Sequence, residues 1–124
     1  MTSAATDPAA GERFPSLEGR RFRAVENSAG GQVGGETEFV FSQAGRFVHA
    51  CYSGGTIELG FLVGVASGER VEFRYAHVDH TGLIASGHSI DIIEVLADGR
   101  LRLHERWRWE SKIGSGTSIL EEIK

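Results

Sequence analysis

Glu105 is the residue whose surroundings in this sequence most favour acid–base chemistry. It lies in the segment Leu101–Trp109, where apolar and charged residues alternate, and it shares the apolar phase with Leu103 and Trp107. A carboxyl group desolvated beside a tryptophan has a raised pKa, which suits a general acid or base near neutral pH. The alternative is a structural glutamate hydrogen-bonded to a neighbouring strand, because buried polar networks also shift pKa values.

Histidine and tyrosine side chains offer a second group of candidates. His88 is expected to face inward with Ser86 and to lie near Tyr75, which would form a polar spot for ligand binding or proton transfer. The alternative is a neutral core histidine paired with the Tyr75 hydroxyl, and His77, nearer one mouth, presents the same choice. The hypothesis therefore assigns catalysis to Glu105, His88 and Tyr75, and ligand binding to Trp107, Trp109, Phe73, His77 and Ser86.

Metal and cofactor motifs are not found in the sequence. The five histidines form no His-Glu-x-x-His pattern and no cupin-like His-x-His pattern, and the single cysteine cannot supply a cysteine pair. The segment Gly114-Ser115-Gly116 lacks both the lysine and the following helix of a phosphate-binding loop. We therefore expect neither a metal nor a cofactor.

Arginines and tryptophans alternate along Arg100–Trp109, which superficially resembles a nucleic-acid surface. The alternation places the two residue types on opposite faces of a strand, whereas a base-stacking platform needs both on one exposed face. The outer arginines are expected to form a solvated ladder with acids such as Glu94, Glu121 and Glu122. The sequence thus disfavours a nucleic-acid partner.

Short strands joined by glycine turns must position these residues. Glycine accounts for 17 of 124 residues, about twice the usual share, and proline for only 2. Glycine costs about 1 kcal/mol in a helix interior, so a helical bundle is excluded. Period-two alternation predicts eight strands, at Arg20–Asn27, Glu36–Ser42, Arg46–Tyr52, Thr56–Gly64, Arg70–Val78, Leu83–Leu96, Leu101–Glu110 and Thr117–Ile123.

Short connections make successive strands antiparallel neighbours, and eight of them predict an all-β, up-and-down, calycin-like barrel. A two-residue turn at Asp98-Gly99 would pair Leu96 with Leu101 and place His88 opposite Trp109. Expected inner sets are Ile84, Ser86, His88, Ile90 and Ile92 in the sixth strand, and Ile57, Leu59, Phe61 and Val63 in the fourth. In the third strand, Phe47, His49 and Cys51 compete for the inner face with Val48, Ala50 and Tyr52.

Charge and composition limit the compartment and the partners. The net charge of −4 supplies no field to attract nucleic acid or anionic lipid, and no apolar run is long enough for a membrane helix. A lone cysteine and the absence of a signal-peptide pattern fit a cytoplasmic protein. We expect a flexible leader at residues 1–18, one barrel domain at 19–124, and a homodimer as a candidate assembly.

Several segments together resemble a family of small bacterial proteins that often carry the name N-acetylglutamate synthase. They are Glu26-Asn27-Ser28, Tyr52–Gly55, Arg74–Val78, Gly99–Trp109 and Gly116–Glu122. The resemblance covers about Gly19 to Glu122 and implies a calycin-like barrel of the lipocalin or avidin type. The sequence lacks the helix-opening Arg/Gln-x-x-Gly-x-Gly/Ala loop of acetyltransferases, which argues against acetyl transfer.

Two functions remain open. The first is a cofactor-independent acid–base enzyme, such as an isomerase, cyclase or lyase, acting on an apolar or amphipathic small molecule in the lumen, for instance in natural-product biosynthesis. The second is a non-catalytic binding barrel that serves as a carrier, sensor or resistance protein. A filled barrel acting by association is a third option, and an open lumen bordered by Glu105, His88 and Tyr75 would favour the first two.

Overall fold

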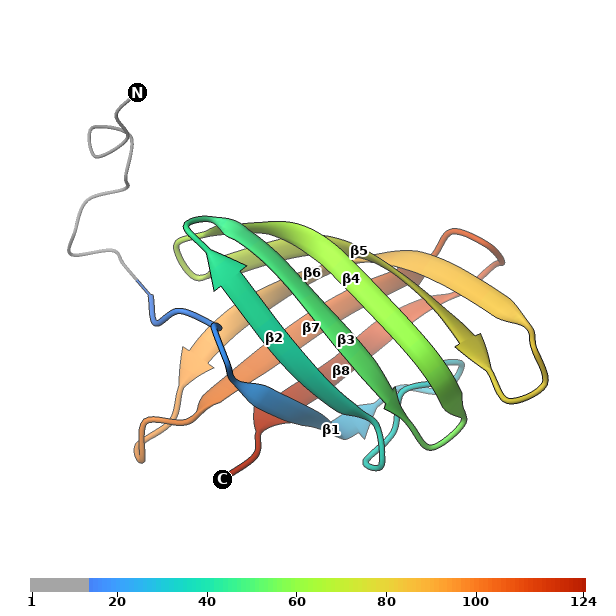
Figure 1. Ribbon diagram of the computed structural model, residues 1–124, viewed down its shortest axis with the longest axis horizontal. Coiled ribbons are helices and arrows are strands. Elements are labelled where there is room, and N and C mark those ends of the chain that lie inside the picture. The colour runs from blue at the N-terminus through green and yellow to red at the C-terminus, as the bar shows by residue number, and fades with distance from the viewer. Residues whose placement is uncertain (1–13) are drawn as a thin grey trace.

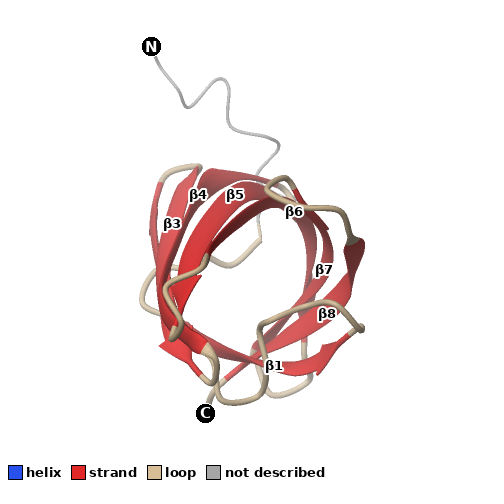
Figure 2. Cartoon of the chain, turned by 90° about the vertical axis from the view of Figure 1, so that its right-hand side faces the viewer, coloured by secondary structure: helices blue, strands red, loops and turns tan. Residues whose placement is uncertain are grey.

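The fold is an eight-stranded antiparallel barrel. The computed structural model describes residues 14–124 (Figure 1). Each strand pairs with its neighbours along the chain, and the last pairs back to the first, which closes the barrel (Figure 2). The predicted fold class is confirmed. The strands are β1 (Arg21–Asn27), β2 (Glu38–Ala44), β3 (Phe47–Gly54), β4 (Ile57–Ser67), β5 (Arg70–Asp79), β6 (Ile84–Val95), β7 (Leu101–Trp109) and β8 (Ser115–Glu122).

One end of the barrel is filled by an apolar core. Its fully buried members include Phe22, Phe41, Val71 and Leu101, together with Leu17, which precedes the first strand. Leu17 was expected to belong to a flexible leader, but it is buried in the core, and its amide donates to the Gln43 side chain. The packed domain therefore begins before residue 19, and residues 1–13 of the predicted leader lie outside the described residues.

The β6–β7 hairpin differs from the prediction by one residue. The amide of Leu96 donates to the carbonyl of Arg100, so Ala97, Asp98 and Gly99 form the loop, and only Gly99 has a positive φ, of 91°. A two-residue type I′ turn needs positive φ at both positions, whereas a three-residue loop needs it only at its final glycine. Val95, rather than Leu96, consequently pairs with Leu101.

This shift reverses every side chain of β6, because successive strand residues face opposite sides. Ala85, Gly87, Ser89, Asp91 and Ile93 face the interior, and the predicted inner set faces outward. The prediction that His88 and Ser86 line the lumen is therefore wrong. Gly87 pairs with Trp109, and Asp91 pairs with Glu105.

A second reversal occurs in β4. Ile57 is buried as predicted, but the β4–β5 register shifts between Ile57 and Leu59, so Leu59, Phe61 and Val63 face outward. Gly60 and Leu62 take the inner positions. A bulge inserts one residue into a strand and exchanges the two faces beyond it, which the apolar pattern alone does not reveal. For β3 the sequence left two inner sets possible. Val48, Ala50 and Tyr52 face inward, and His49 and Cys51 face outward.

The outer face of β7 matches its predicted role. Arg102 pairs with Glu121 on β8 at 2.6 Å and lies 3.9 Å from Glu94 on β6, while Arg100 lies 3.0 Å from Glu121. Trp107 and Trp109 face inward, so the arginines and tryptophans lie on opposite faces. No helix long and apolar enough to cross a membrane occurs among residues 14–124.

Candidate functional site

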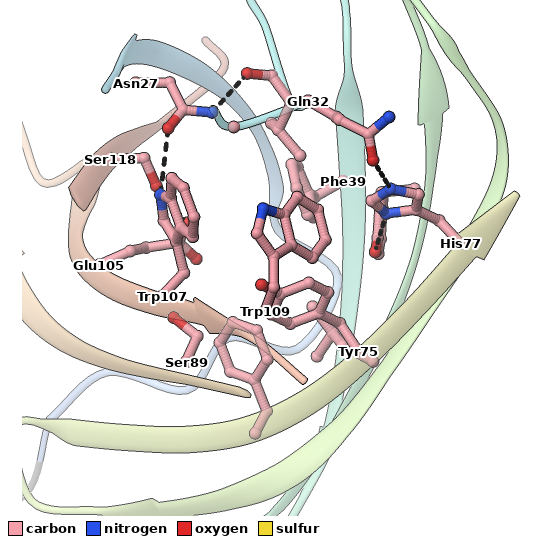
Figure 3. A pocket seen from close by; sticks show the side chains of 15 residues that line it. Asn27, Gln32, Phe39, Tyr75, His77, Ser89, Glu105, Trp107, Trp109 and Ser118 are labelled. Carbon is pink, nitrogen blue, oxygen red and sulfur yellow. Dashed lines mark hydrogen bonds between the residues drawn. The ribbon is translucent and has the colours of Figure 1, made fainter. Parts of the chain in front are cut away.

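A cavity lies in the barrel lumen beside the apolar core, and Figure 3 shows the side chains that line it. Its empty volume is about 420 Å³, a figure that includes the solvent-filled mouth. Strands β3, β5 and β7 supply most of its aromatic wall, and the segment between β1 and β2 lies at its mouth. The aromatic lining consists of Phe39, Tyr52, Phe73, Tyr75, Trp107 and Trp109.

Two carboxyl groups lie together at the inner end of the cavity. Glu105 on β7 lines the cavity and is 9% exposed, whereas its cross-strand partner Asp91 on β6 is fully buried behind it. The Ser118 hydroxyl donates to Glu105 Oε1 at 2.6 Å, and the Ser89 hydroxyl donates to Asp91 Oδ1 at 2.6 Å. The other oxygen of Asp91, Oδ2, is buried without a hydrogen-bond partner.

Burial raises the pKa of both carboxyl groups. Desolvation is the main cause for Glu105, and the neighbouring Asp91 and the hydrogen bond from Ser118 partly oppose it. The pKa of Asp91 rises well above its ordinary value, first through desolvation and then through the proximity of Glu105. Two adjacent carboxyl groups in an apolar setting do not readily ionise together, so their raised pKa values favour a form in which the pair keeps one proton.

Inward-facing glycines make room for the aromatic rings. A Cβ at Gly60 would lie 2.5 Å from the Tyr52 ring, and one at Gly116 would lie 2.6 Å from the Trp107 ring. Gly87 has the same relation to Tyr75, whose hydroxyl occupies the space that a side chain would fill. Glycine in a strand allows such close approach. In each case a glycine on one strand leaves room for the aromatic ring of its neighbour on the adjacent strand, and these pairs shape the lumen.

Polar contacts fix the mouth of the cavity. The Tyr52 hydroxyl lies 2.9 Å from His77 Nδ1, and His77 Nε2 lies 2.8 Å from the Gln32 side-chain oxygen. This pairing fits a neutral imidazole that donates from Nε2 and accepts at Nδ1. Burial and, to a lesser extent, Lys112 lower the pKa of His77, which favours the same neutral form.

The tryptophan N–H groups are also paired. Trp107 Nε1 donates to Asn27 Oδ1 at 3.1 Å, and Trp109 Nε1 donates to the Gly30 carbonyl at 3.2 Å. The two rings lie side by side, with centroids 5.7 Å apart, and both point into the cavity (Figure 3). Because their donors are occupied at the mouth, the indole rings present apolar faces to the lumen.

The structure brings together most of the predicted site residues. Glu105, Tyr75, Trp107, Trp109, Phe73 and His77 all line the cavity. His88 instead lies on the outer face, where its Nε2 is 2.7 Å from a Glu72 oxygen. Ser86 is also on the outer face, and its amide donates to the Ser111 hydroxyl.

Sequence reasoning missed several residues of the site. Ser89, Ser118, Asn27 and Gln32 line the cavity, and Asp91 lies directly behind Glu105. For Asp91 a signal was present, because it is an acid flanked by isoleucines in an apolar strand. The small polar residues carry no such signal, since serine and asparagine occur equally in turns. Across residues 14–124, histidine, cysteine and acidic side chains form no group of three suited to a metal ion.

The fold and the cavity define a calycin-like barrel with a lumen open at one end. A family model described as avidin-like protein matches residues 15–123, so the chain belongs to the avidin-like family. This agrees with the avidin-type resemblance of the sequence. Searches of curated proteins and of solved structures found no match.

Proposed function

We propose that the protein binds a small, largely apolar molecule in the lumen of its barrel. The observation that supports this function best is the cavity itself, which has aromatic walls and the carboxyl group of Glu105 at its inner end. Pockets of this kind bury the apolar body of a ligand and orient it through a few polar groups. Membership of the avidin-like family also favours small-molecule binding.

Ligand binding is tested by a thermal-unfolding screen of small aromatic and alicyclic molecules. A ligand that binds only the folded chain raises its Tm in a concentration-dependent way. We expect Trp107→Leu to weaken binding of the hits about tenfold or more, because Trp107 supplies a large part of the wall. Phe61→Ala, on the outer face of β4, is the matched control and should keep wild-type affinity. Equal affinity of the Trp107→Leu variant would contradict the proposal.

Acid–base catalysis on the bound molecule is the second candidate function. It is favoured by the raised pKa of Glu105, which faces the cavity with the Tyr75 ring in the same wall. A carboxyl group of this kind suits cofactor-independent isomerisation, cyclisation or elimination. His88 takes no part in this scheme, because it lies outside the barrel.

Substitution of Glu105 separates catalysis from binding. For any hit that the protein also converts, we expect Glu105→Gln to lower turnover by 10²-fold or more, about the contribution of one general acid or base. Product formation is measured by chromatography, and Glu94→Gln on the outer face of β6 is the control. Full turnover by Glu105→Gln would exclude the acid–base role, whereas weaker binding without any conversion would favour the binding function.

A further inference from the structure

The inner end of the cavity combines two acids with no base. Glu105 faces the cavity, Asp91 lies behind it, and the nearby serine hydroxyls are already donating to these carboxyl groups. Asp91 Oδ2 is buried and lacks a partner. A ligand group that reaches this end therefore meets carboxyl oxygens, which accept hydrogen bonds. The serine hydroxyls offer it no donor, because they already donate to the two acids.

No cationic side chain compensates these acids. Within residues 14–124, no lysine or arginine is buried or lines the cavity. The groups that face the pair from the adjacent strands are Val71, Phe73 and Tyr75 on β5, and Ser118 and Leu120 on β8. The titratable groups that also face the lumen are the Tyr75 and Tyr52 hydroxyls and the neutral His77 ring. Lys112 stays outside, with its Nζ 4.5 Å from the Trp109 ring centroid.

A buried carboxylate without a counter-ion is costly, so a bound cation would gain by pairing with it. The walls favour the same kind of ligand, because the faces of tryptophan and tyrosine rings attract cations. An anionic ligand would meet like charge in a low dielectric medium. The uncompensated acids and the aromatic walls therefore favour one class of ligand, a cation with an apolar body.

We propose that the inner end of the cavity binds the positively charged nitrogen of a small organic amine with an apolar body. Glu105 is the carboxylate that contacts the ammonium group, and Asp91 is the positioning acid that holds a proton beside it. This inference rests on the proposed function, because it names the ligand class of the same cavity. If Glu105 is protonated before binding, its proton leaves to solvent as the ammonium ion pairs with the carboxylate, so amine affinity rises with pH.

Three probes of similar shape test the ligand class: 2-phenylethylamine, 2-phenylethanol and phenylacetate. Calorimetric titrations of the full chain at pH 5.5 and 7.5 compare their affinities, and buffers of different ionisation enthalpy report proton release. We expect the amine to bind about tenfold or more tightly than the alcohol, and phenylacetate to bind weakest. Equal affinity of amine and alcohol would overturn the cation site while leaving small-molecule binding intact. Failure of all three probes to bind would overturn the cation site, while the thermal-unfolding screen decides small-molecule binding separately.

Variants assign the roles of the two acids. Glu105→Gln keeps the shape but removes the charge, so the amine should lose its advantage while the alcohol keeps its affinity. Asp91→Asn replaces a carboxylic acid with a weaker amide donor, so the preference for the amine should remain while its pH profile moves upward. Loss of a purely structural residue would leave the pH profile in place, so an unchanged profile would refute the positioning role of Asp91. Glu94→Gln, on the outer face, should match the wild type in every measurement.

Folding of the variants is checked by near-ultraviolet circular dichroism. If Glu105→Gln does not fold, Asp91→Asn together with the three-probe comparison on the wild type decides the proposal. Amine preference in the wild type and a displaced pH profile in Asp91→Asn would support it. Amine preference without a displaced profile would reject the role of Asp91. A displaced profile without amine preference would reject the cation site at Glu105.

Discussion

Asp91 illustrates how a single buried acid links stability to pH. Its pKa is higher in the folded chain than in the unfolded chain, because burial and the neighbouring Glu105 disfavour its charge. The folded chain then binds more protons than the unfolded chain over the interval between the two pKa values. The contribution of this group is fully present below the ordinary aspartate pKa and is lost as pH rises through the folded value.

Asp91→Asn should therefore stabilise the chain increasingly as pH rises. An asparagine has no proton to lose, so we expect the free energy of unfolding of the variant to exceed that of the wild type by about 1–3 kcal/mol at pH 8. Near pH 4.5 the difference should be small. Urea denaturation between these pH values measures the trend, and Glu94→Gln serves as control. A difference that stays constant across the pH range would contradict this account.

Some residues of the site could be predicted from the sequence and others could not. Glu105 and the two tryptophans could be predicted, because each stands in phase with leucines on an alternating strand. His88 could not be placed, since both faces of β6 contain apolar and polar residues. Asp91 became a member of the site only through its pairing with Glu105, a relation between strands that depends on the hairpin.

At the scale of elements, strand existence could be predicted better than strand register. All eight predicted strands are present with small differences at their ends. The facing of β4 and β6 was wrong because a bulge at Ile57–Leu59 and a three-residue loop at Ala97–Gly99 each displace the pattern by one residue. Period-two alternation turns such a displacement into a complete exchange of faces. Local sequence leaves these choices open, and packing of the whole barrel decides them.

Gly87 on β6 provides a test of how the elements shape the lumen. A methyl group there would collide with the Tyr75 hydroxyl and lie 2.5 Å from the Arg108 carbonyl oxygen. Gly87→Ala should therefore lower the free energy of unfolding by about 1–3 kcal/mol, as overpacking usually does, and weaken ligand binding by displacing the Tyr75 ring. Chemical denaturation and calorimetry measure the two effects. Gly34→Ala, which meets nothing within 4 Å, should leave both unchanged, and a neutral Gly87→Ala would contradict the close packing.

At the scale of the whole molecule, closure of the barrel leaves apolar residues on both of its surfaces. The lumen side holds the core and the cavity, while the outer side exposes apolar residues on neighbouring strands. The outward set includes Val40, Phe47, Phe61, Val63 and Val65. Contiguous exposed apolar residues on soluble proteins commonly mark association surfaces.

The homodimer expected from the sequence stays a prediction at this scale. Sedimentation velocity should show a dimer at micromolar concentration, and Val63→Glu should shift it towards the monomer, because a charge placed among apolar residues opposes their burial. Thr81→Glu, in the exposed turn after β5, is the control and should leave the sedimentation coefficient unchanged. A wild-type monomer at all concentrations would reject the prediction.

The segment of residues 28–37 joins β1 to β2 and lies at the mouth of the cavity, beside the route by which a ligand enters and leaves. Gln32 pairs with His77, and the Gly30 carbonyl accepts from Trp109, so the same rings that line the cavity also fasten this segment. A molecule that enters or leaves through the open mouth passes beside these two hydrogen bonds. We therefore expect substitutions in this segment, such as Gln32→Ala, to change how long a ligand stays bound, because they loosen the chain beside its exit.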